Sequence, residues 1–113
     1  MSENIEIKLI MSSDKIIYSD IENFIIGLKI TNNNDKAEKF DISKTKLFVN
    51  NAESIAWSLC TQNGTIINLT IPSKKTETIQ WPLGTALFQT IGEYHLKLLW
   101  NSIVQEAKVT VMK

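Results

Sequence analysis

The sequence predicts an all-β protein, an immunoglobulin-like antiparallel β-sandwich of about seven to nine strands. Short runs with an apolar side chain at every second position recur along the chain, and such runs form half-buried strands. Turn-forming residues separate these runs at intervals of about eight to twelve residues, as in sandwiches and barrels. No segment keeps a helical period over the length of an ordinary helix. The 113 residues contain no repeat or linker, so 1–113 is predicted to be a single domain.

The longest alternation is a predicted hairpin between Gly92 and Met112. Its apolar positions are Tyr94, Leu96, Leu98 and Trp100 in the first strand and Ala107, Val109 and Val111 in the second. Asn101 and Ser102 lie between the strands as the turn. An isolated hairpin is only marginally stable in water, so its apolar face must pack against a second sheet that the rest of the chain supplies.

The other strands are predicted from the same pattern. They cover residues 5–9, 16–18, 24–31, 40–42, 47–49, 55–60, 66–71 and 76–81. The interruption at 12–14 is typical of a first strand that breaks and crosses between two sheets. Asn50-Asn51 is a predicted turn, and Asn63-Gly64 is the predicted hairpin turn between 55–60 and 66–71. Residues 85–91 fit either a short helical turn or an irregular crossover.

Gly92, Glu93 and Tyr94 place a tyrosine at the start of the penultimate strand. In immunoglobulin-like sandwiches a tyrosine at this point buries its ring and caps a backbone group with its hydroxyl, an arrangement called the tyrosine corner. The motif therefore favours an immunoglobulin-like sandwich over a barrel.

Several motifs also come in the order found in one family of such domains. They are Thr31-Asn32-Asn33, Phe40-Asp41-Ile42, Trp57-Ser58, the lysine-rich turn before Trp81, and Gly92-x-Tyr94. On these motifs the chain, between about residues 20 and 100, resembles the bacterial intracellular proteinase inhibitors at the level of the fold. It departs from them after Trp81, where Leu87-Phe88 replaces a polar, Gly/Pro-rich loop. The resemblance implies a sandwich that acts on another protein through its loops.

Charge and composition argue against several function classes. Twelve basic residues balance twelve acidic ones, and every basic residue is lysine. Without a positive field or the bidentate guanidinium of arginine, we expect no binding to nucleic acid or to a membrane. A single cysteine, Cys60, suits a reducing compartment, and no signal peptide precedes the first strand. We therefore expect a cytoplasmic protein, although a chain that had lost its leader would look the same.

The residues that catalysis needs are also missing. The chain has one histidine, His95, and one cysteine, and nothing in their spacing joins them as base and nucleophile. It shows no metal-ligand spacing and no glycine-rich phosphate loop. We predict a protein without enzymatic activity, metal or cofactor, in which Cys60 packs as a small apolar side chain and His95 is solvated.

The three tryptophans have two interpretations. Trp57 and Trp100 share predicted strand faces with aliphatic residues, which favours burial, whereas exposed tryptophans would form a platform for sugars. Trp81 stands at a strand end, with Leu83, Leu87 and Phe88 close behind it. This cluster is predicted either to cap the core or to leave an apolar patch open to a partner.

The candidate binding residues therefore lie in loops. They are the mixed tip Trp81, Leu83, Leu87 and Phe88, which is preferred, and the basic tip Lys74 and Lys75. The basic tip is predicted to be a solvated turn, with entry into the pocket of a lysine-preferring protease as the less favoured alternative. The predicted function is a non-catalytic module that binds another protein, with a protease as one candidate. The alternative is a carbohydrate-binding or structural sandwich. Unpaired sheet edges also predict homo-oligomers.

Overall fold

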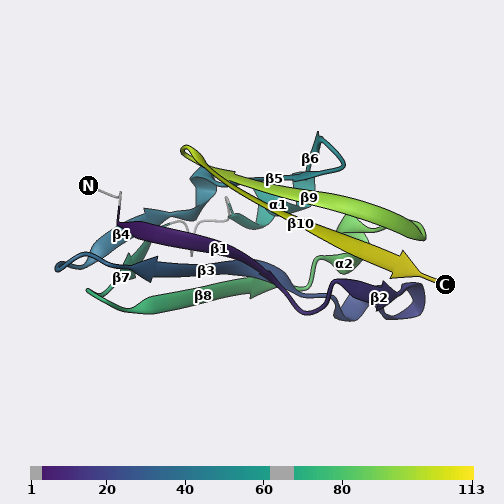
Figure 1. Ribbon diagram of the computed structural model, residues 1–113, viewed down its shortest axis with the longest axis horizontal. Helices are drawn as coiled ribbons and strands as arrows, with labels where there is room; N and C mark the ends of the chain where they lie inside the picture. The colour runs from purple at the N-terminus through teal and green to yellow at the C-terminus, as the bar shows by residue number, and fades with distance from the viewer. Residues whose placement is uncertain (1–3, 62–67) are drawn as a thin grey trace.

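The computed structural model describes residues 4–61 and 68–113, which form an all-β fold with few helices (Figure 1). Its strands are β1 (Ile5–Met11), β2 (Lys15–Ile17), β3 (Ile26–Asn32), β4 (Glu38–Asp41), β5 (Lys46–Val49), β6 (Ala52–Glu53), β7 (Asn68–Ile71), β8 (Thr76–Trp81), β9 (Gly92–Trp100) and β10 (Ile103–Met112). The helical segments are η1 (Tyr18–Asn23), η2 (Ile42–Lys44), α1 (Ile55–Thr61) and α2 (Gly84–Leu87). The predicted all-β class is confirmed.

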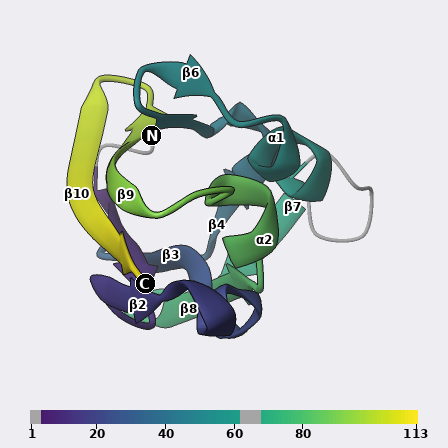
Figure 2. The same cartoon turned by 90° about the vertical axis from the view of Figure 1, so that its right-hand side faces the viewer.

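Two layers of sheet face each other (Figure 1). One sheet has the strand order β1-β3-β8, the other has the order β2-β10-β9-β5-β6, and β4 and β7 form a separate pair. Among the described strands, the pairings are antiparallel except that of β2 with β10. In Figure 2, α1 and α2 lie on the side of the sandwich opposite β10.

The first strand divides between the two sheets, as the sequence predicts. β1 pairs with β3 over its whole length, and after a break β2 joins the other sheet beside β10. Ser12 holds the junction, because its N–H donates to the carbonyl of Ile25 at 2.9 Å and its hydroxyl accepts the N–H of Ile25 at 3.0 Å. The structure has ten strands, one above the predicted range, with β1 and β2 counted separately and with β6, which was not predicted, among them.

The C-terminal hairpin is confirmed in its bounds and its register. Trp100 lies opposite Ile103, and Asn101 in the turn between them has φ 53°, the left-handed conformation that a two-residue turn needs. The side chains that alternate inward are buried, namely Leu96, Leu98, Val109 and Val111.

The core fills the space between the layers. Ile26, Leu28 and Ile30 of β3 are fully buried in one cluster with Leu96 and Leu98 of β9. Burying each such side chain stabilises the fold by about 1.5–3 kcal/mol relative to leaving it in water. β3 has this central place because β1 and β8 flank it on either side.

Residues 55–60, predicted as a strand, form the helix α1 instead. Ser54 begins it, because its hydroxyl accepts the N–H of Trp57 at 3.2 Å and its carbonyl accepts the N–H of Ser58 at 3.2 Å. The alternation of Ile55, Trp57 and Leu59 is therefore not a strand face. Trp57 points into the core, while Ile55 and Leu59, four residues apart, lie together on the exposed side.

Three further predicted segments can be compared with the structure. β4 ends at Asp41, whose carboxylate accepts the N–H of Ser43 at 3.0 Å and so begins η2 where the prediction continued the strand. In the segment 85–91 the helical alternative was correct, because α2 covers Gly84–Leu87. The predicted turn Asn63-Gly64 lies outside the described residues.

The hydroxyl of Tyr94 donates to the carbonyl of Thr90 at 2.7 Å and accepts the N–H of Thr90 at 3.2 Å. We expect Tyr94→Phe to lower the free energy of unfolding by about 0.5–1.5 kcal/mol, because it removes both bonds between the hydroxyl and the Thr90 backbone while the ring stays packed. Urea denaturation measures the loss. The control is Tyr18→Phe, an exposed residue whose hydroxyl makes a single bond, to the Gln89 carbonyl at 3.2 Å, and whose loss should cost less. Equal losses in both variants would contradict a special role for Tyr94.

Candidate functional site

The predicted binding tip after β8 is part of the core. Leu83 and Leu87 are 9% and 7% exposed, and Phe88 is fully buried. The ring of Phe88 packs edge-on against Phe24 with 4.9 Å between centroids, and it also contacts Tyr94 at 4.8 Å. The prediction of an exposed apolar tip was therefore wrong, and the cluster caps the core, which was the other alternative.

The tip is buried because α2 packs tightly on η1. Gly84, the first residue of α2, sits against the backbone of Ile21, and a β-carbon there would lie 2.8 Å from the β-carbon of Phe24. The absence of a side chain at Gly84 allows this close approach. It brings Leu87 and Phe88 over the end of the core instead of into solvent.

The tryptophans do not form an exposed platform. Trp57 is fully buried, Trp100 is 6% exposed, and Trp81 is half-buried. Trp81 packs edge-on against Trp57 with 5.3 Å between centroids, and Trp100 packs against Phe40 at 5.0 Å. The predicted burial of Trp57 and Trp100 is confirmed, and Trp81 joins the edge of the same cluster.

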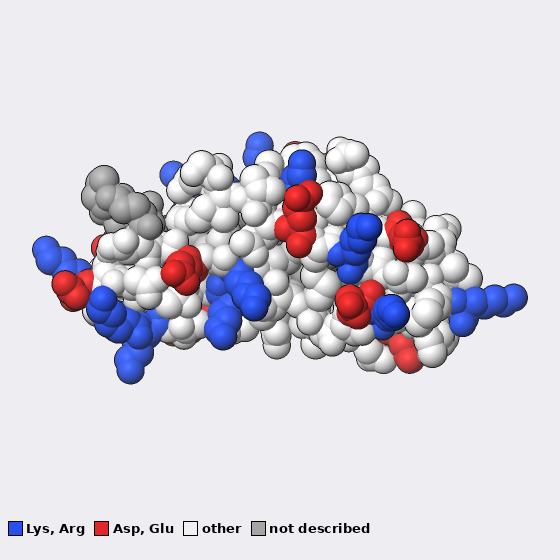
Figure 3. All heavy atoms as spheres, in the orientation of Figure 1, with Lys and Arg blue, Asp and Glu red and all other residues white. Residues whose placement is uncertain are grey.

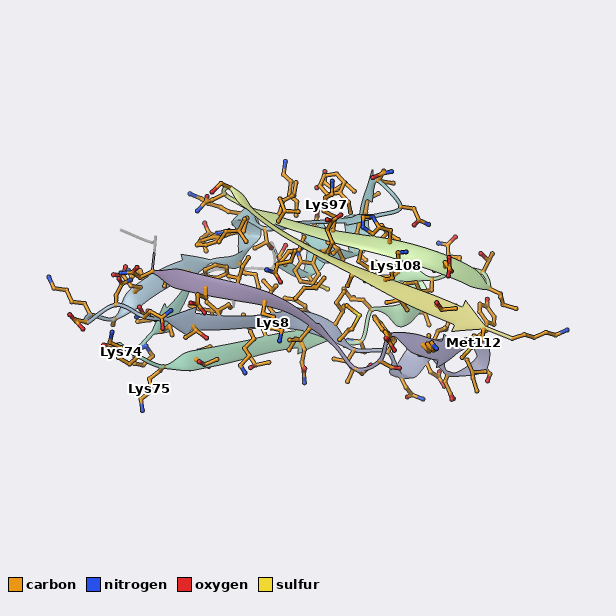
Figure 4. All side chains as sticks on the ribbon, viewed as in Figure 1. Lys8, Lys74, Lys75, Lys97, Lys108 and Met112 are labelled. Atoms are coloured by element: carbon orange, nitrogen blue, oxygen red, sulfur yellow. The ribbon has the colours of Figure 1, made fainter. Side chains whose placement is uncertain are left out.

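Lys74 and Lys75 lie in the turn between β7 and β8, at the end of the molecule far from Met112 (Figure 4). Lys74 has φ 61°, and its ammonium donates to the carbonyl of Asn33 at 2.7 Å and lies 3.5 Å from the carboxylate of Asp35. The Lys74 side chain thus contacts the neighbouring loop although it is 61% exposed, and Lys75 is exposed as well. A protease pocket binds an extended backbone, which the left-handed turn at Lys74 does not present.

A buried asparagine joins the two loops at this end. The side-chain amide of Asn32 donates to the carbonyls of Ile71 and Lys36, each at 2.9 Å. The hydroxyl of Ser73 donates to the carbonyl of Asn34 at 2.7 Å. The β3–β4 loop and the β7–β8 turn are therefore cross-linked by hydrogen bonds into one unit.

The structure shows an apolar surface that the sequence prediction missed, on the outer side of α1. Ile55 and Leu59 are 74% and 69% exposed, the highest values among the large hydrophobic side chains of the described residues. They stand beside an open groove of about 580 Å³ between α1, the β5–β6 hairpin and α2. We call Ile55, Leu59 and this groove the α1 surface. The groove is lined among others by Val49, Ala52, Glu53, Ala56, Ala86 and Tyr94.

The inner side of α1 holds this surface in place. The indole N–H of Trp57 donates to the hydroxyl of Thr45 at 3.0 Å, and that hydroxyl donates in turn to the carbonyl of Ile42 at 2.7 Å. The N–H of Ser54 donates to the carbonyl of Leu47 in β5 at 2.7 Å. Because these contacts are buried or part of the backbone, the exposed side chains sit on a fixed helix.

Among the described residues that line the groove, Glu53 is the one with a charge. Its carboxylate accepts the hydroxyl of Ser58 at 3.2 Å. On the face that carries β1 and β10, by contrast, lysines and carboxylates are interspersed (Figure 3). The α1 surface is thus mainly apolar with a single negative charge at its rim.

The titratable groups of the described residues form no cluster that could act as a catalytic or metal site. Burial raises the pKa of the Cys60 thiol, which keeps it protonated at neutral pH. His95 lies 2.9 Å from Glu106 in a part-exposed pair on neighbouring strands. No three His, Cys, Asp or Glu residues in the described part of the chain stand close enough to hold a metal ion. Nor is any helix in those ranges long and apolar enough to cross a membrane.

The comparisons with known proteins bear on the fold. No family model and no curated protein matches this chain. Among solved structures it resembles a β-glucosidase from Listeria innocua in complex with glucose, with a TM-score of 0.55 and 12% sequence identity. The match covers 96% of this chain but only 16% of the enzyme chain. At that identity the likeness shows a shared fold and nothing of the activity.

Proposed function

We propose that this protein is a non-catalytic, immunoglobulin-like sandwich that binds another protein through the α1 surface. The assignment to the immunoglobulin-like class is supported by the two facing sheets, the first strand divided between them, and the Tyr94 hydroxyl bonded to the backbone of Thr90. The likeness to a segment of a larger protein agrees with a module of this kind.

One observation carries the binding proposal, namely the exposure of Ile55 and Leu59 on a helix that is itself firmly anchored. Large side chains that remain in water cost free energy that burial under a partner would recover, and such patches beside a groove mark protein-binding sites. Ile55 and Leu59 provide apolar contacts for a partner, and the groove beside them can accept a protruding side chain of that partner. A partner segment with an apolar side chain and a nearby basic group fits both the pair and Glu53.

A protease remains one candidate partner, on the resemblance of the chain to proteinase inhibitors. The α1 surface is a better support for that role than the Lys74 tip, because the Lys74 side chain is held by Asn33 and Asp35. The sugar-binding alternative loses its support, since it needs exposed tryptophans and none of the three is exposed. The glucose bound to the structural neighbour belongs to that enzyme.

Photo-crosslinking in the native cell tests this proposal. A photoreactive amino acid at Leu59 is expected to crosslink one protein, whereas the same group at Thr78, exposed on β8, is not expected to crosslink it. Adding Ile55→Ser should abolish the crosslink, and the variant pair Ile55→Ser/Leu59→Ser should bind the purified partner at least about tenfold more weakly.

The matched control removes two other exposed apolar side chains, Ile17→Ser/Met112→Ser, which lie together on β2 and β10. Both double variants should keep the wild-type melting temperature within a few degrees, because all four side chains are exposed. Loss of binding in the control as well would show that the α1 surface is not the site. If the partner is a protease, its inhibition is relieved by the α1 variants alone.

A further inference from the structure

The edge of β10 is open over most of its length. β10 pairs with β9 from Ile103 to Val111, but on its other side β2 covers only Thr110 to Met112. Within the described residues no strand pairs with the segment between Ile103 and Val109 on that side. This stretch is therefore a row of unpaired backbone groups, of the kind that recruits another strand.

The hairpin turn determines which residues direct their backbone outward. Its two-residue turn makes Trp100 and Ile103 a hydrogen-bonded pair, so Ile103 and every second residue after it bond to β9. The residues between them turn their N–H and C=O to the open edge. Thr110 confirms this parity, because its N–H donates to the carbonyl of Asp14 on the β2 side at 2.9 Å. Positions 104, 106 and 108 thus present backbone donors and acceptors that have no strand partner among residues 4–61 and 68–113.

We infer that a second copy of this chain binds here, adding its own β10 antiparallel to the first about a two-fold axis at Gln105. In this register Val104 of each copy lies opposite Glu106 of the other. Both residues direct their backbone to the open edge, so each such pair exchanges two hydrogen bonds. The ladder ends where Lys108 meets Ser102 of the other copy, because the hairpin turns away there.

Length and charge select this register over its neighbours. An axis at Ala107 would carry the strand of the second copy past Thr110, where β2 already lies. An axis at Glu106 would set two carboxylates directly opposite each other, which is unfavourable. An axis at Val104 would shorten the ladder. The axis at Gln105 therefore gives the longest pairing that avoids both β2 and like charges.

The surroundings leave room for the added strand. Val104 is an apolar side chain on the outer face, 51% exposed, which the pairing would partly cover. On the inner face an open hollow of about 400 Å³ separates Gln105 from β1, and its polar lining of Glu6, Lys8 and Thr31 suits a second glutamine amide. Figure 4 shows Lys108 further along β10, toward the end of the free stretch.

The proposed contact has closed two-fold symmetry, and it does not cover the α1 surface. Because each copy uses the same edge, the pairing satisfies both edges at once and yields a dimer instead of a fibre. The α1 surface lies on the side of the sandwich opposite β10 (Figure 2). The dimer would therefore present two copies of that surface, facing away from the axis.

Charge substitutions at Val104 test the register. Val104→Lys sets an ammonium opposite the Glu106 carboxylate of the other copy at two equivalent positions, and it should lower the dimer dissociation constant about threefold to tenfold. Val104→Glu sets a carboxylate opposite the same group and should raise that constant at least about tenfold. The double variant Val104→Glu/Glu106→Lys restores opposite charges and should recover most of the affinity. Sedimentation velocity measures all three.

A backbone variant tests the edge without changing any charge. Val104→Pro removes an N–H that points to the open edge, which an edge strand tolerates but an added strand does not. It should remain folded by circular dichroism and show weakened dimerisation. A wild-type protein that stays monomeric up to millimolar concentration would overturn the inference, and so would equal effects of Val104→Lys and Val104→Glu. Neither result bears on crosslinking at Leu59, so the two proposals fail separately.

Discussion

The double variant Leu87→Ser/Phe88→Ser is expected to unfold the domain. Phe88 is fully buried between Phe24 and Tyr94, and Leu87 is 7% exposed at the same end of the core. Truncating two such side chains costs about 5 kcal/mol or more in free energy of unfolding, which is comparable to the whole stability of a small domain. The added hydroxyls increase this cost, because they would be buried. Thermal denaturation followed by circular dichroism measures the effect.

The matched comparison is Ile55→Ser/Leu59→Ser, which makes the same kind of change on the exposed side of α1. That variant should melt close to wild type. If Leu87→Ser/Phe88→Ser also melted normally and lost a binding partner, the residues would be an exposed tip after all, which is the other alternative that the sequence left open. The two variants therefore separate a core cluster from an interaction surface by a single measurement.

Trp57→Ala is expected to cost about 3–5 kcal/mol of unfolding free energy, because Trp57 is the largest of the fully buried side chains. Trp57 is fully buried, packs on Trp81 at 5.3 Å, and donates its indole N–H to Thr45. The truncation leaves a cavity in the core and removes the indole donor from the Thr45 hydroxyl, which keeps its own bond to the carbonyl of Ile42. For a domain of this size the melting temperature should fall by roughly 10 °C or more.

Two control variants divide this loss into its parts. Trp57→Phe keeps most of the apolar volume but loses the bond to the hydroxyl of Thr45, so it should cost less than Trp57→Ala. Leu59→Ala on the same helix should cost well under about 1 kcal/mol, because Leu59 is 69% exposed. A Trp57→Ala protein as stable as Leu59→Ala would mean that α1 does not pack as the structure shows.

Much of the fold could be predicted from the sequence because its strands follow the period of two. The hairpin β9–β10, the turn at Asn101, the crossing of the first strand between sheets and the bounds of β8 were all predicted. In these segments one face of the strand packs on the core and the other is in water. The alternation of apolar and polar residues therefore corresponds to alternating buried and exposed positions. The strand list differs in two places, because residues 55–60 form α1 instead of a strand and β6 at Ala52–Glu53 was not predicted.

The helix α1 could not be predicted from that pattern, for a physical reason. Ile55, Trp57 and Leu59 alternate like a strand, yet the core takes only Trp57, and the two aliphatic side chains stay in water. Periodicity predicts structure only when the apolar residues are the buried ones. The available signal was Ser54, a preferred helix-starting residue whose hydroxyl accepts the N–H of Trp57. The α1 surface was missed for the same reason.

For the tip residues the error was the opposite one, because they were preferred as exposed binding residues and are buried. Leu83, Leu87 and Phe88 follow a proline and a strand end, which made them loop residues in sequence, and loops are usually on the surface. Their burial depends on Gly84 packing against Ile21, more than sixty positions earlier in the chain. A contact between residues so far apart in the chain cannot be read from the local sequence pattern. Burial of a loop residue therefore depends on distant contacts, whereas burial along a strand follows the local alternation.

The amide of Asn32, which holds Ile71 and Lys36 together, has a consequence for engineering. The β3–β4 loop and the β7–β8 turn cannot be exchanged independently. A foreign segment in either one would leave hydrogen-bonding groups of the other without their partners. Diversified libraries built at this end must vary both loops as one cassette. A cassette that keeps Asn32 itself would retain the amide and leave the remaining positions open to selection.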